Sequence, residues 1–159
     1  MTRSTDAGSH PKLYALAAFL AVAGLADSVY LTVTHLTGED VTCLASSGCS
    51  EVLSSAYATL GNIPLGAFGA FGYFAAFSLA TLSAFGSSLA VILLRVLVAG
   101  MLAMTLWLLY VQAFILHAFC DFCLLSAALT FSLSVIVTIG ILIERRSRMQ
   151  ASQEPMIES

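Results

Sequence analysis

The sequence predicts an all-α membrane protein: a bundle of four transmembrane helices with an outer loop between the first two. Composition gives two reasons, because 59% of the 159 residues are hydrophobic and only 9% are charged, against roughly 25% charged residues in soluble domains. The third reason is the presence of four long apolar segments. This composition excludes an ordinary cytosolic domain, a disordered chain and a basic nucleic-acid-binding protein.

Each apolar segment is long enough to cross the hydrocarbon core as a helix, which takes about 20 residues. The first segment follows a polar N-terminus, and the second begins after a polar stretch that is the one real loop, residues 37–62. A Gly-Ser-Ser turn precedes the third segment, and a short junction precedes the fourth. The alternation expected of a membrane barrel is absent. The predicted spans are residues 13–36, 63–85, 89–116 and 122–143.

Basic residues near span ends mark the cytoplasmic side of a membrane protein. All six Lys and Arg residues fall on one side if residues 1–12 and 144–159 are cytoplasmic, and the loop carries only acidic charges. We therefore expect a cytoplasmic N-terminus, a membrane domain over residues 13–143 and a disordered cytoplasmic tail over residues 144–159. A cleavable signal peptide ending near Ala23 is disfavoured, because the apolar run continues to Leu36.

The four cysteines form two pairs, and this topology places all of them at the outer, oxidising side. Cys43 and Cys49 lie in the loop, whereas Cys120 and Cys123 form a C-x-x-C at the start of the fourth helix. Unpaired N–H groups at a helix start favour a thiolate on the first cysteine. Thiol–disulfide exchange between a water-exposed pair and a pair at the lipid boundary would carry two electrons from the aqueous side into the membrane.

Three alternatives to this redox hypothesis remain, and a fourth shares its chemistry. The cysteines could form two structural disulfides in a non-enzymatic tetraspan protein that binds partners through its loop. They could also bind zinc, although the gap between Cys43 and Cys49 is wide for a zinc knuckle. A metal transporter would need soft ligands within the spans, where the sequence has none. A DsbB-type quinone reductase carries its C-x-x-C in the first outer loop, the reverse of the order here.

The cysteines stand in a longer pattern that resembles a known family. Val-Leu-Ser-Ser follows the loop pair at residue 52, Gly-Asn-Ile-Pro enters the second span at residue 61, and Phe-Cys-Asp-Phe-Cys-Leu opens the fourth at residue 119. Over residues 24–126 the chain resembles the vitamin K epoxide reductase family, in particular its compact bacterial members. The resemblance implies four helices around a quinone, menaquinone or ubiquinone, with the outer loop as a lid.

The resemblance also implies a role for each cysteine. Cys43 would exchange with a separate thioredoxin-like, DsbA-like protein outside the cytoplasm, and Cys49 would pass electrons to Cys120. Cys123 would reduce the quinone, and Ser55 would order the lid. Together these roles imply a membrane thiol:quinone oxidoreductase that drives disulfide formation. No thioredoxin-like domain follows Ile143 in this sequence, so we expect the reductant to be another protein.

This sequence departs from the vertebrate members of the family at two places. Ala127 stands where they have a tyrosine, and Pro64 and Leu65 occupy the region of their quinone-contacting asparagine. These departures favour a plain quinone over vitamin K epoxide as the substrate.

Asp27 lies inside the first span, where an ionisable group is costly and by default a functional candidate. Tyr30, Thr34 and His35 share its helical face, and Gln112 and His117 lie at the outer end of the third span. One hypothesis is that this stripe supplies protons to the quinone; the alternative is a neutral or paired Asp27. The expected quinone-site or lid residues are Ser55, Asp27 and Phe119. Trp107 and Tyr110 suit helix packing or interfacial anchoring better than quinone stacking.

Overall fold

The computed structural model describes residues 11–38, 48–55, 57–60 and 63–153. Within them, four helices are long and apolar enough to cross a membrane. This confirms the predicted all-α, four-helix membrane bundle, and each span begins and ends within two residues of its predicted limits. The long helices are α1 (Pro11–Thr37), α3 (Leu65–Ala84), α4 (Ser88–Tyr110) and α5 (Asp121–Gln153).

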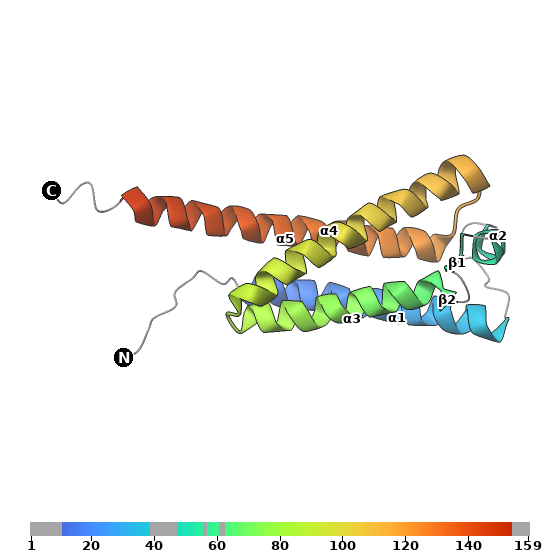
Figure 1. Ribbon diagram of the computed structural model, residues 1–159, viewed down its shortest axis with the longest axis horizontal. Coiled ribbons are helices and arrows are strands. Elements are labelled where there is room, and N and C mark those ends of the chain that lie inside the picture. The colour runs from blue at the N-terminus through green and yellow to red at the C-terminus, as the bar shows by residue number, and fades with distance from the viewer. Residues whose placement is uncertain (1–10, 39–47, 56, 61–62, 154–159) are drawn as a thin grey trace.

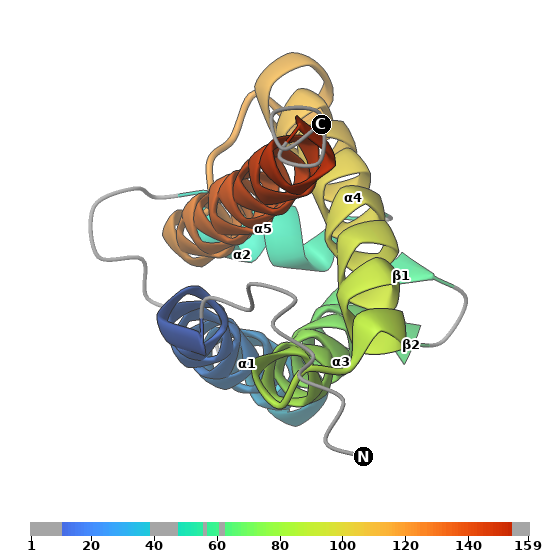
Figure 2. The same ribbon diagram turned by 90° about the vertical axis from the view of Figure 1, so that its left-hand side faces the viewer.

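The four helices form a ring in which α1 packs against α3 and α5, and α4 packs against the same two helices (Figures 1 and 2). The closest approach is between α1 and α3. A Cβ at Gly66 would lie 2.8 Å from Thr32 Oγ1, and one at Gly69 would lie 2.9 Å from Ser28 Oγ. Small residues allow such contact where lipid removes the hydrophobic driving force between helices.

The core of the bundle is narrow and consists of alanines with a few larger residues. The buried residues that pack together are Ala17, Ala21, Tyr73, Ala76, Ala80, Leu94, Val98, Leu133 and Val137. Larger apolar side chains point outward; Phe71, for example, is 74% exposed. An apolar outer surface of this extent is stable only against lipid, so the pattern of burial agrees with the membrane assignment.

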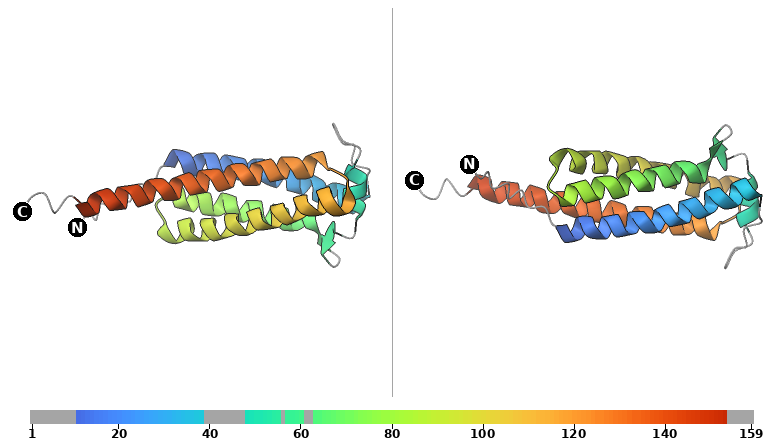
Figure 3. Two further views of the ribbon diagram at one scale, coloured as in Figure 1. Left: turned by 90° about the horizontal axis from the view of Figure 1, so that it is seen from above. Right: turned by 90° about the horizontal axis from the view of Figure 1, so that it is seen from below.

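One end of the bundle carries a cap (Figure 3). It contains the short helix α2 (Cys49–Ser54) and an antiparallel pair of two-residue strands, β1 (Thr59–Leu60) and β2 (Ile63–Pro64). Leu65 N–H donates to the Ala58 carbonyl and joins this pair to the start of α3. The described part of the predicted outer loop is therefore structured and covers the ends of the helices.

The opposite end of the bundle holds the start of α1 and the turn between α3 and α4, where Gly86 adopts φ +88°. From this end α5 extends beyond the other helices (Figure 3). The prediction of disorder from residue 144 is wrong for residues 144–153, which continue the helix. These residues include no glycine or proline, and the first proline after the span is Pro155, so nothing interrupts the helix before Gln153.

The third span ends in an irregular turn. The last residues of this span form a π-helix, η1 (Val111–Leu116), and His117 ends it in the left-handed conformation with φ 51°. Single π-turns are common at functional sites because they redirect side chains. Here the turn brings Gln112 to the junction that leads into α5.

Candidate functional site

Cys120 lies at the junction between η1 and α5, and its side chain is fully buried. Its backbone N–H donates a 3.2 Å hydrogen bond to Gln112 Oε1, and its carbonyl accepts the N–H of Leu124 in the first turn of α5. A buried N–H requires a partner. The π-turn supplies one through Gln112, which itself is only 3% exposed.

Cys120 and Cys123 are both free thiols. The pKa of Cys120 falls from 9.0 to about 7, because the Cys123 thiol and the backbone N–H groups of Cys123 and Phe122 donate to its sulfur and outweigh burial. Donors at a helix start stabilise the thiolate in this way. Cys120 is therefore the more nucleophilic member of the pair near neutral pH, as expected from its position at the helix N-terminus.

Cys49, the first residue of α2, is disulfide-bonded and almost fully buried. The preceding residue, Gly48, lies against the chain at the other cysteine pair: a Cβ there would be 2.8 Å from the carbonyl oxygen of Phe119. The backbones of Gly48 and Phe119 are thus in contact. Cys49 follows the first of these residues, and Cys120 follows the second. Cys43 lies outside the described residues.

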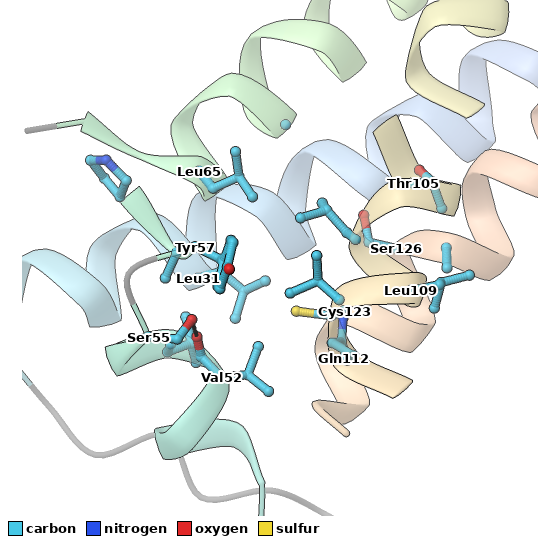
Figure 4. Close-up of a pocket in the computed structure, with 18 of the residues that line it drawn as sticks. Leu31, Val52, Ser55, Tyr57, Leu65, Thr105, Leu109, Gln112, Cys123 and Ser126 are labelled. Atoms are coloured by element: carbon cyan, nitrogen blue, oxygen red, sulfur yellow. Dashed lines mark hydrogen bonds between the residues drawn. The ribbon is translucent and has the colours of Figure 1, made fainter. Parts of the chain in front are cut away.

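A cavity of about 140 Å³ lies between the cap and the ends of the helices that the cap covers (Figure 4). Most of its walls are apolar, and Cys123 is the cysteine that lines it. An apolar cavity of roughly 150 Å³ holds one six-membered ring. Polar side chains reach it from several elements: Ser28 and His35 of α1, Ser55 and Tyr57 of the cap, Thr105 of α4, Gln112 of η1 and Ser126 of α5.

The structure separates the three quinone-site or lid residues that the sequence suggested. Ser55 lines the cavity, and its hydroxyl donates to the Val52 carbonyl 2.7 Å away, at the end of α2. Asp27 and Phe119 are not among the residues that line it. Asp27 is buried between the helices, 8% exposed, while the Phe119 side chain is 46% exposed.

The polar residues that share one face of α1 do not all reach the cavity. His35 lines the cavity, but Tyr30 does not; its ring lies tilted against that of Phe122, with ring centroids 5.0 Å apart. The Thr34 hydroxyl donates to carbonyls of its own helix. Trp107 and Tyr110 stack on each other on the outer surface, more than half exposed, where they suit the membrane interface.

Sequence reasoning missed one polar cluster in the middle of the bundle. The Tyr73 hydroxyl donates to the Ser126 carbonyl and lies within 3.0 Å of the Ser126 and Thr130 hydroxyls. Serine and threonine in membrane helices commonly bond their own backbone, as Ser83 does here. Only the tertiary contact between α3 and α5 distinguishes Ser126 and Thr130 from serines and threonines that bond their own helix alone.

A comparison with known protein families gives one match. A model of the vitamin K epoxide reductase family matches residues 15–138. The chain belongs to this family. The match spans all four membrane helices and both cysteine pairs, so the sequence-based resemblance is confirmed.

As a vitamin K epoxide reductase family member, the protein is a multi-pass membrane oxidoreductase that acts on thiols and disulfides. Family members use quinones and exchange electrons with a thiol-redox partner. The residues at the cavity fit a quinone: its walls are apolar, and Gln112 and Ser126 offer hydrogen-bond donors for ring oxygens.

Proposed function

We propose that the protein is a thiol:quinone oxidoreductase that reoxidises a separate thioredoxin-like protein and passes its electrons to menaquinone or ubiquinone. The observation that carries this proposal is the position of the C-x-x-C pair. Cys120 is buried directly after Phe119, whose backbone contacts the residue that precedes Cys49, whereas Cys123, one turn later, lines an apolar cavity of the size of a single ring. The pair thus links the cap to the cavity.

The proposed electron route uses two disulfide exchanges. The dithiol of the partner reduces a disulfide between Cys43 and Cys49 and is itself oxidised to a disulfide. The Cys49 thiolate then attacks Cys120 in the oxidised C-x-x-C, and Cys123 leaves as a thiolate that takes up a proton. Attack of Cys43 on Cys49 restores the loop disulfide and frees Cys120. Two electrons have then moved to Cys120 and Cys123.

The structure contains a disulfide at Cys49 together with free Cys120 and Cys123, which is the arrangement expected after these exchanges. A bound quinone supplies a two-electron, two-proton acceptor. Gln112 and Ser126 would hold and orient it next to Cys123, and Ser55 would order the cap that covers it. The position of Cys123 in the cavity wall also favours this function over a tetraspan protein with two structural disulfides.

The basic residues support an outward position for the cap, on the periplasmic or extracellular side. Lys12 lies in the first turn of α1, and Arg145 and Arg146 follow the span of α5, all at the end of the bundle opposite the cysteines. Under the positive-inside rule this end is cytoplasmic. The cysteines then meet the oxidising compartment that such a partner occupies.

The experiment is quinone reduction by the purified protein, supplied with a small dithiol and followed by absorbance, with the uncatalysed rate subtracted. We expect turnover in the native protein and none in Cys123→Ala. Cys43→Ala should retain turnover with the small dithiol but lose it with a thioredoxin-like protein as reductant. Absence of turnover in the native protein with both quinone classes would refute the proposal, and loss of both activities in Cys43→Ala would refute the division of roles.

A further inference from the structure

Asp27 is the one ionisable carboxyl group in the interior of the described bundle, and the electron route above does not use it. Both its oxygens are buried and have no hydrogen-bond partner within the described residues. A charged carboxylate without a partner is strongly disfavoured among apolar side chains. Burial without a partner therefore favours the protonated, neutral form of Asp27.

The surroundings of Asp27 connect it to the cavity. One turn before it, Gly24 lies directly under the Tyr73 ring, so that any side chain at residue 24 would overlap the ring. Asp27 is close enough to Tyr73, Cys120 and Cys123 to interact electrostatically with all three. These are the titratable groups that face it from α3 and from the start of α5.

The Tyr73 hydroxyl continues the connection. It contacts the hydroxyls of Ser126 at 3.0 Å and Thr130 at 2.8 Å, and Ser126 lines the cavity on the same face of α5 as Cys123. Hydroxyl groups both donate and accept hydrogen bonds, so a row of them can relay a proton. The contact of Gly24 with the Tyr73 ring places the turn of α1 next to Asp27 at the start of this row.

The proton balance of the cysteine pair shows why quinone reduction would need a proton from this row of hydroxyls. Near neutral pH about half of the reduced pairs consist of a Cys120 thiolate beside a Cys123 thiol, since the pKa of Cys120 is about 7. When this pair closes to a disulfide it releases two electrons but only one proton, whereas reduction of a quinone to a quinol consumes two of each. One proton must come from another group.

We propose that Asp27 supplies this second proton through Tyr73 and Ser126 to the cavity. The inference rests on the proposed function. In a single turnover, the pair gives two electrons and the proton of Cys123, Asp27 gives one proton and becomes a carboxylate, and the quinol leaves neutral. Asp27 then regains a proton from water before the next turnover. Asp27 and Tyr73 are thus proton-relay residues that do not touch the quinone.

The first test is infrared difference spectroscopy of the reduced, quinone-free protein. We expect the carbonyl band of a protonated carboxylic acid in the native protein and its loss in Asp27→Asn, which keeps the size and polarity of the side chain. Absence of this band in the native protein, or its persistence in Asp27→Asn, would overturn the proposal. This measurement contains no quinone, so its outcome is independent of the proposed function.

The second test mixes pre-reduced protein with a short-chain ubiquinone and follows one turnover. Asp27→Asn and Tyr73→Phe should slow quinol formation about a hundredfold, with the largest effect at high pH, where solvent protons are scarce. Tyr30→Phe is the matched control, because Tyr30 lies one turn from Asp27 but does not line the cavity, and it should keep the native rate. Native rates in Asp27→Asn would overturn the relay while leaving the oxidoreductase function intact.

Discussion

Gly48 and Phe119 are in backbone contact, and each of them immediately precedes a cysteine. A Cβ at residue 48 would meet the Phe119 carbonyl oxygen at 2.8 Å and its nitrogen at 2.9 Å. Backbone atoms at a junction that is fixed by hydrogen bonds cannot easily move away. The absence of a side chain at Gly48 is therefore what allows the start of α2 to lie against the junction that precedes Cys120.

The first prediction concerns this contact. Gly48→Ala should displace the start of α2 and slow exchange between Cys49 and Cys120 about tenfold or more, since small misplacements of reacting groups are costly. Turnover with a thioredoxin-like reductant measures this step. Quinone reduction after direct chemical reduction of Cys120 and Cys123 should stay unchanged. Gly100→Ala is the control, because a Cβ there meets nothing within 4 Å; equal behaviour of the two variants would contradict the prediction.

The second prediction concerns the ionisation of Cys120. Its pKa of about 7 lies below the ordinary value of 9.0 because the Cys123 thiol donates to its sulfur. Thiolate absorbance of the reduced pair should therefore rise as the pH increases through 7. In Cys123→Ala the midpoint should move up toward 9.0, whereas Cys123→Ser keeps a donor and should stay closer to the native value. The same midpoint in Cys123→Ala and native protein would exclude this cause.

The third prediction concerns Gln112. Its replacement by leucine leaves the buried N–H of Cys120 without an acceptor, which costs about 1–3 kcal/mol. We expect a lower free energy of unfolding in detergent, and slower quinone reduction because the start of α5 is less well fixed. Gln150→Leu, at an exposed position on the extension of α5, should change neither property. Native stability of Gln112→Leu would show that water or another group satisfies this N–H.

The sequence predicts the four helices well because each span must bury a continuous apolar segment, and that signal is local. It also marks both cysteine pairs, whose residue type and spacing are distinctive. It does not predict α2, because helix formation there depends on packing against η1, nor the π-turn, which a hydropathy pattern does not reveal. The links from Gln112 to Cys120 and from Tyr73 to Ser126 join different segments, so they follow only from the fold. Asp27 stands out in the sequence, but only the structure separates it from the cavity.

The last prediction concerns the cavity beside Cys123. Ala127 lines it, four residues after Cys123, and is 5% exposed. In Ala127→Phe, an aromatic ring would occupy much of the 140 Å³ space. Quinone reduction should then fall about tenfold or more, as expected when a ligand pocket is filled. Exchange between Cys120 and the loop disulfide should continue, because Cys120 lies outside this space, and trapping of thiols with a mass-tagged alkylating reagent measures it.

Ala128→Phe is the matched control, since Ala128 is exposed on the lipid side of the same helix turn. If both variants reduced quinone at the native rate, the quinone would have to bind elsewhere, and Cys123 would need another route to its acceptor.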